Sequence, residues 1–127
     1  MKRLLMGISL IAAFAPCNAA WVLTHDNANA SYYVDRESRI QNGNLVKMWT
    51  MIDFRKADVM DGRAYLSYLT LLEVDCQEKK FRKLQMTFYS GHKGSGESGY
   101  SESRIGDWSY AVPNSTGMLM ISIACGK

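Results

Sequence analysis

Two histidines and a pair of neighbouring carboxylates are the residues of this sequence whose types could support catalysis. His25 precedes Asp26, and His92 lies two residues after Ser90. A catalytic base must be held within hydrogen-bond reach of its nucleophile. His92, however, falls in a glycine-rich run. His25 lies near the N-terminus that would remain after removal of residues 1–20, a predicted signal peptide, and chain termini are often poorly ordered. Neither histidine therefore predicts a catalytic site.

Glu73 and Asp75 are the paired carboxylates. Two residues apart on a strand, they share one face and lie about 7 Å from each other, a separation open to glycosidase chemistry. Surface charge is the commoner explanation of such a pair, and we prefer it. Metal binding by the two histidines with Asp26 or Glu97 has no supporting ligand spacing. We expect no enzymatic activity, no metal and no cofactor.

The cysteines bear on compartment and stability. Of the three, Cys17 lies in the N-terminal segment, and Cys76 and Cys125 lie in the remainder. Two cysteines in a small exported domain usually form a bridge. Closing this loop of about 50 residues would stabilise the fold by about 4 kcal/mol in the chain-entropy model. A reactive or metal-binding pair is the alternative, although the sequence lacks CxxC spacing.

The N-terminal residues 1–20 have the order of a secretory signal peptide. A basic start at Met1–Arg3 precedes an apolar run at Leu4–Ala15, and small residues at Ala19 and Ala20 supply the cleavage site. The apolar run is too short for a membrane span, which needs about 20 residues. Cys17 as a lipid-acceptor cysteine is the alternative, but a proline precedes it where a small residue is usual.

Residues 21–127 are expected to form one domain. Without the two basic residues of the signal, the formal charge falls from +3 to +1. A nucleic-acid partner therefore has little electrostatic support. A basic cluster at Lys79–Lys83 is interpreted as a solvated turn and strand start, with an anion site as the alternative.

Hydrophobic residues alternate with period two along three segments, Leu45–Phe54, Ala64–Cys76 and Phe81–Tyr89. This alternation predicts strands with one buried face. Asn42-Gly43 is suited to a tight turn after a strand at Ser31–Asp35, and Gln77–Lys80 can join the next pair. The strands are therefore expected to be antiparallel, with the even-numbered positions forming the core. Irregular structure is predicted for 55–63 and for the glycine-rich run 90–99.

The C-terminal apolar run at Met118–Cys125 is predicted to be a helix. Ser115 can cap its first turn, and Gly126 is placed to end it. A buried final strand is the alternative that periodicity leaves open. Since Cys76 lies on the expected core face, Cys125 must reach that face, as a short helix packed across the sheet would do. The fold class is therefore α+β, an antiparallel sheet with a C-terminal helix tethered to it by a disulfide.

Ordered short motifs along the chain resemble those of the surface-adhesin protein E family of Gram-negative bacteria. The matching pieces are Tyr33-Val34-Asp35, Gly43-Asn44 with Val46 and Trp49, Tyr65-Leu66-Ser67, Asp75-Cys76 with Arg82, Ser90-Gly91, Trp108, Pro113-Asn114-Ser115 and Ala124-Cys125-Gly126. They cover nearly the whole chain after the signal. The resemblance implies the same sheet and helix and a non-enzymatic role at the cell envelope, with attachment to host matrix proteins. The C-terminal segment is more apolar than the Trp- and charge-bearing helix of that family.

The face of the sheet opposite the expected core is the candidate binding surface. One-sided sheets are mostly polar on the outer face, but here it carries aromatic and large apolar side chains, a composition typical of protein-binding surfaces. The candidate residues are Trp49, Met51, Tyr65, Leu69, Leu71, Phe81 and Tyr89. The loop Ser90–Gly99 is a second candidate contact. Cover by 58–63 or 100–110, homodimerisation through this face, and a periplasmic accessory role are the alternatives.

Overall fold

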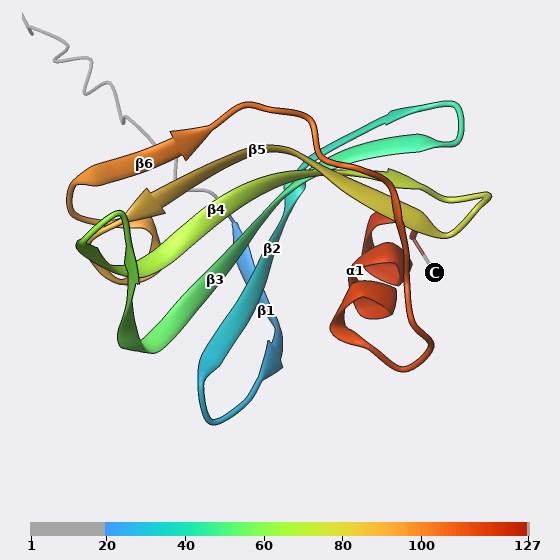
Figure 1. The fold of residues 1–127 in the computed structure, drawn as a ribbon. Coiled ribbons are helices and arrows are strands. Elements are labelled where there is room, and N and C mark those ends of the chain that lie inside the picture. The colour runs from blue at the N-terminus through green and yellow to red at the C-terminus, as the bar shows by residue number, and fades with distance from the viewer. Residues whose placement is uncertain (1–19, 127) are drawn as a thin grey trace, which may run out of the picture.

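A computed structural model describes residues 20–126, and the predicted signal peptide lies outside the described residues except for Ala20. The chain forms a seven-stranded antiparallel sheet and one C-terminal α-helix (Figure 1). The strands are β1 (Trp21–Asp26), β2 (Ala30–Asn42), β3 (Leu45–Met60), β4 (Arg63–Asp75), β5 (Lys80–Tyr89), β6 (Ser98–Glu102) and β7 (Ser109–Tyr110); the helices are η1 (His92–Gly94, 3-10) and α1 (Thr116–Ala124). The predicted α+β class is confirmed.

Strands β1 to β6 follow one another in the sheet, each antiparallel to its neighbour. The turn that joins β2 to β3 is formed by Gly43 and Asn44, one residue later than predicted, because Asn42 still pairs with Leu45. Gly43 adopts a φ of 62° that favours glycine. In the β4–β5 turn, the Asp75 carboxylate accepts hydrogen bonds from the backbone N–H groups of Gln77 and Glu78, both at 3.0 Å. Asp75 therefore shapes a turn, in keeping with a structural role.

The prediction of irregular structure at 55–63 is wrong. Strand β3 continues to Met60, and Asp61 and Gly62, both with positive φ, turn the chain into β4. The two strands shift register between Asp53 and Asp58 and pair again up to Met60 and Arg63. This part of the hairpin extends as an exposed ribbon, and its polar sequence lacks the alternation that one buried face would impose.

A β-bulge in β5 changes which of its residues face the helix. Leu71 pairs with Gln85 but Leu72 pairs with Lys83, so Leu84 is the extra residue. Before the bulge the odd-numbered side chains of β5 face α1, and after it the even-numbered ones do. Phe81 consequently packs against the core rather than on the opposite face.

Both β6 and β7 pair with the outer edge of β5, one at each end. Between them, the backbone N–H of Gly106 donates to the carbonyl of Lys83 at 2.8 Å. The edge of β5 is therefore hydrogen-bonded along much of its length, which removes an exposed edge that could pair with another chain.

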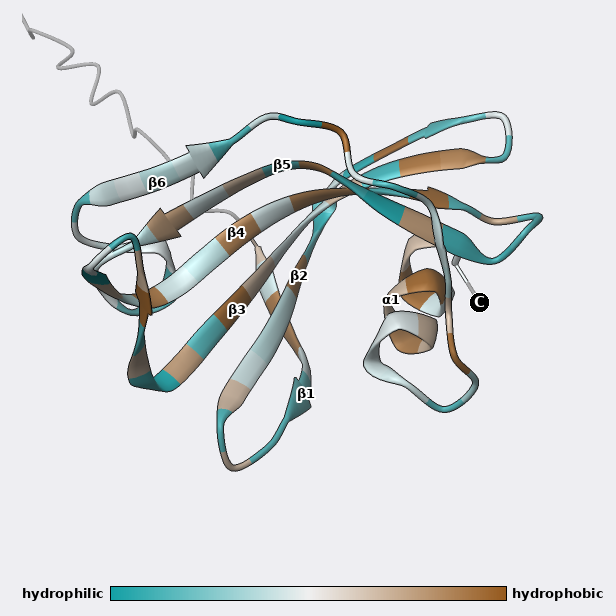
Figure 2. Cartoon of the chain, in the orientation of Figure 1, coloured by the Kyte–Doolittle hydropathy of each residue, from teal (hydrophilic) through white to brown (hydrophobic). Residues whose placement is uncertain are grey.

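Helix α1 packs against one end of the sheet, near the β2–β3 and β4–β5 turns (Figure 1). Ser115 caps it as predicted, its hydroxyl accepting from the N–H of Met118 at 3.2 Å, and Gly126 follows its end with a φ of 74°. The helix is largely hydrophobic, and hydrophobic and polar residues alternate along β3 and β4 (Figure 2). Its buried side chains join those of three strands in the core: Val34, Val46, Met48, Val74, Met120, Ile121 and Ala124.

The predicted disulfide joins Cys76, after β4, to Cys125, at the C-terminal end of α1. Arg39 of β2 adds a second tie, because its Nε donates to the carbonyl of Ala124. The C-terminal end of the helix is therefore attached to the sheet at two places, next to β4 and at β2.

Candidate functional site

The sheet face opposite α1, called the open face below, carries the odd-numbered side chains of β3 and β4. One row of residues crosses five strands there in register. Trp21 pairs with Asp35, Asp35 with Trp49, Trp49 with Leu71, and Leu71 with Gln85. The row therefore contains two tryptophans with a carboxylate between them, and a leucine next to the second tryptophan.

A groove of about 310 Å³ runs along this row and the adjoining one. Its walls come from β1 to β5, and its aromatic side chains are half-buried, so each still offers surface to a partner. The lining residues are Trp21, Asp35, Trp49, Leu69, Gln85, Thr87 and Tyr89. The mixture of two indoles, a phenol and a carboxylate suits contacts with another polypeptide.

Asp35 is held at the bottom of the groove by a bulge in β2. Register with β3 is lost after Asp35 and resumes at Ile40. Within the bulge, the Asp35 carboxylate accepts the N–H of Glu37 at 3.1 Å. The Ser38 hydroxyl donates to the Asp35 carbonyl at 2.6 Å and accepts the N–H of Trp49 at 2.9 Å. This places a carboxylate, 9% exposed, beside an indole in a fixed position.

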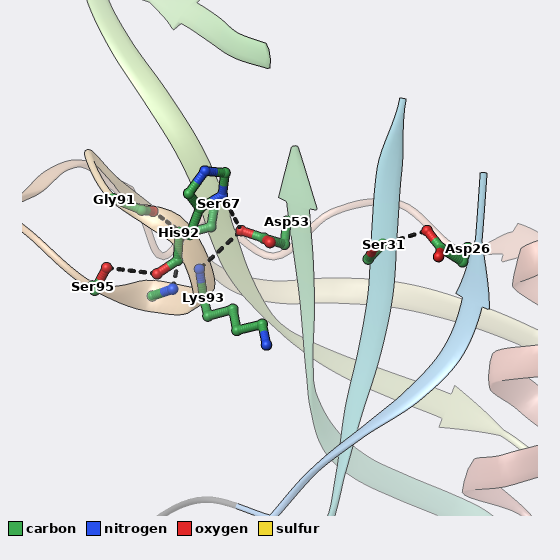
Figure 3. A network of polar contacts seen from close by, with 9 residues as sticks. Asp26, Ser31, Asp53, Ser67, Gly91, His92, Lys93 and Ser95 are labelled. Atoms are coloured by element: carbon green, nitrogen blue, oxygen red, sulfur yellow. Dashed lines mark hydrogen bonds and ion pairs between the residues drawn. The ribbon is translucent and has the colours of Figure 1, made fainter. Parts of the chain in front are cut away.

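The loop between β5 and β6 folds back over the neighbouring part of the open face (Figure 3). The Ser67 hydroxyl donates to the Gly91 carbonyl at 2.7 Å and accepts the Gly94 N–H at 2.8 Å. The Asp53 carboxylate accepts the Lys93 N–H at 2.9 Å and lies 3.0 Å from the ring nitrogen Nδ1 of His92. The glycine-rich run is thus fixed to β3 and β4 and borders the groove beside Leu69.

The opposite end of the open face carries an ion pair under an indole. Glu73, 6% exposed, accepts hydrogen bonds from Nε and Nη2 of Arg82 at 2.8 and 2.6 Å. The Arg82 guanidinium lies 4.3 Å from the centre of the Trp108 ring, and the Lys80 ammonium lies 5.1 Å from it. The prediction that Glu73 is surface charge is wrong, because its carboxylate is buried and paired. The basic cluster is likewise engaged in contacts within the chain.

Comparison with known proteins decides the family. Residues 21–126 match the surface-adhesin protein E family. This chain belongs to the surface-adhesin protein E family.

Solved structures of protein E from Haemophilus influenzae have the same fold. Crystal form II gives a TM-score of 0.68 at 17% sequence identity, covering 86% of this chain and 89% of that one. Protein E from non-typeable Haemophilus influenzae gives 0.63 at 17% identity, covering 84% and 77%. At this identity the likeness concerns the fold alone. No curated protein matches the chain.

Within this protein E fold, the seven candidate binding residues do not form one surface. Trp49, Leu69 and Tyr89 line the groove, and Leu71 lies in the row beside it. Phe81 lies on the helix face because of the bulge at Leu84.

Met51 and Tyr65 are 1% and 3% exposed and are therefore inaccessible to a partner. Met51 lies in register with Tyr33 and Leu69, both of which contact η1. The Tyr65 hydroxyl accepts the N–H of Tyr100 at 2.9 Å, and its ring packs on Phe88. Met51 is thus covered by the Ser90–Gly99 loop, and Tyr65 is covered by β6.

Trp21 and Asp35 belong to the groove but were not among the predicted site residues. The sequence contains no signal for Asp35 on the open face. Next to the turn, odd positions of β2 pair with even positions of β3, and only the bulge after Asp35 brings Asp35 opposite Trp49. Trp21 has no such signal either, since the six residues of β1, WVLTHD, show no alternation of apolar and polar residues.

The histidines show no catalytic arrangement in the part of the chain that the structure covers. The His92 ring pairs with Asp53, while the Ser90 hydroxyl accepts the N–H of Glu97 at 2.9 Å. The His25 ring packs 5.5 Å from that of Tyr32. Between residues 20 and 126, no three His, Cys, Asp or Glu side chains are grouped as metal ligands would be. In the same range no helix has the length and apolar character needed to cross a membrane.

Proposed function

We propose that this chain is an exported, non-enzymatic binding protein of the bacterial envelope that attaches to a host extracellular-matrix protein through the groove on the open face. Membership of an adhesin family supports a role in binding other proteins. The N-terminal signal pattern supports export. The groove supplies the contact surface.

The proposal rests on the row Trp21, Asp35 and Trp49, which lines the groove. Energetically important interface residues are most often Trp, Tyr and Arg set in well-packed pockets. A carboxylate between two indoles attracts a cation, by charge and through the faces of the rings. The matching side chain on the matrix protein is therefore a lysine or arginine.

Binding of the purified protein to immobilised matrix proteins, measured by surface plasmon resonance, tests this proposal. Trp49→Ala and Tyr89→Ala should each weaken binding by about 30-fold, since truncating a hot-spot residue costs about 2 kcal/mol. Asp35→Asn should weaken it as well and make it less sensitive to salt.

Tyr110→Ala is the matched control. Tyr110 is 68% exposed and lies on β7, away from the groove lining. Equal losses for the control and the groove variants would contradict a specific site. Sedimentation of the wild-type protein and the groove variants, without any matrix ligand, tests self-association through the groove. A wild-type dimer and monomeric groove variants would show that the groove binds a second copy of the chain.

A further inference from the structure

A second cleft lies on the other side of the sheet, between the start of α1 and the face that the helix covers. Its volume is about 290 Å³. The apolar walls are Tyr32, Ile52, Tyr68, Leu72, Phe81 and Met86. A cleft of this size is at the lower limit for small-molecule sites. It is too small for a folded partner and large enough for one hydrocarbon chain or ring system.

The cleft is lined by few charged or strongly polar groups. Lys83 is the one charged residue among those lining it, and the start of α1 contributes Thr116 and Gly117. The first turn of α1 contains no acidic residue, and Ser115 satisfies the N–H of Met118 only. Unpaired N–H groups and the helix dipole favour an anion at a helix N-terminus. Lys83 adds a full positive charge to the same wall.

A third polar group at the floor points to a missing hydrogen-bond partner. Thr70 is 6% exposed and lines the cleft, and its hydroxyl has no hydrogen-bond partner in the described structure. Thr70 pairs with Met86, two residues along β4 from Leu72, which pairs with Lys83. A buried hydroxyl without a partner is unfavourable.

Tyr68, one of the two tyrosines that line the cleft, does not supply competing negative charge. Burial, with smaller contributions from Tyr32 and Asp58, raises the pKa of Tyr68 to about 12. Its phenol is therefore a neutral side chain at physiological pH. The Lys83 ammonium lies 3.4 Å from a carboxylate oxygen of Glu102, and both side chains are about one-third exposed. A long, solvent-accessible pair of this kind can be exchanged for a ligand anion at little cost.

We propose that this cleft binds a monomeric single-chain amphiphile with a carboxylate head group, of the medium-chain fatty-acid class. The hydrocarbon chain would lie against the apolar walls. The carboxylate would lie between Lys83, Thr70 and the first turn of α1. This site is separate from the groove on the open face and does not depend on its function.

Isothermal titration of the purified exported protein with decanoate, below its micelle concentration, tests the assignment. Saturable binding of one decanoate per chain is expected. Lys83→Gln should weaken decanoate binding by about tenfold, the loss of one charge-assisted contact, and leave binding of the uncharged decanol unchanged. Lys56→Gln, which removes an exposed lysine outside the cleft, is the matched control.

Ile52→Trp, which fills the cleft from β3, should abolish binding of both probes. If that variant does not fold, the proposal is still tested by comparing the binding of decanoate and decanol to Lys83→Gln. The proposal is overturned if decanoate does not saturate, if Lys83→Gln binds it as wild type does, or if the protein binds anionic phospholipid vesicles but not monomeric decanoate.

Discussion

At the scale of single residues, two threonines that face each other across β3 and β4 have opposite hydrogen-bond states. Thr50 and Thr70 are partners in register. The Thr50 hydroxyl donates to the carbonyl of Thr70 at 3.1 Å, whereas the Thr70 hydroxyl has no partner among the described residues. Both side chains are buried, at 7% and 6% exposure. The pair therefore offers an internal comparison of a satisfied and an unsatisfied hydroxyl.

Thr70→Val should raise the free energy of unfolding by about 1 kcal/mol, because it removes a buried hydroxyl that is left unpaired. Thr50→Val, the matched control, should lower it by about 1 kcal/mol, because a made hydrogen bond is lost. Urea unfolding measures both. Destabilisation of the two variants by equal amounts would show that Thr70 has a hydrogen-bond partner in solution.

At the scale of elements, the strands, the turn residues and the capped helix could be predicted from the sequence, because each has a local cause. Alternation marks β3 and β4, Asn42-Gly43 marks a turn, and Ser115 marks a helix start. The bulge at Leu84 has no local signature, since one extra residue leaves the alternation on either side intact. Phe81 was placed on the wrong face for this reason.

The cover of Met51 and Tyr65 was also out of reach of sequence reasoning. It depends on Ser67 and Asp53 binding backbone groups of the Ser90–Gly99 loop, more than 20 residues away along the chain. Such contacts follow from the folded arrangement, and no local pattern encodes them. Three of the seven predicted residues, Trp49, Leu69 and Tyr89, line the groove, because the alternation along their strands sets the face on which they lie.

The disulfide is the element-scale feature with the largest expected effect. Replacing both Cys76 and Cys125 by alanine should lower the free energy of unfolding by about 3 to 4 kcal/mol, because the open chain regains the entropy of a loop of 49 residues. Urea unfolding of the variant should match that of wild type under strong reductant. A loss below about 1 kcal/mol would mean that core packing, with Arg39, holds the helix without the bridge.

At the scale of the whole molecule, the sheet separates the two proposed binding surfaces. The open face has a groove with two tryptophans, a tyrosine and a carboxylate, suited to a polypeptide. The helix face has a smaller apolar cleft with one lysine, suited to a small amphiphile. A ligand on one face has no direct contact with the lining of the other. The two proposals can therefore succeed or fail independently.

An adhesin has to be exposed outside the cell, and this requirement is tested by protease digestion of intact cells. A periplasmic protein serves as the control for leakage, and the isolated protein establishes that the protease can cleave it. Digestion of this protein while the periplasmic control survives is the expected result. Protection of a protein that is cleavable in isolation would place it inside the outer membrane and contradict direct attachment to a host matrix.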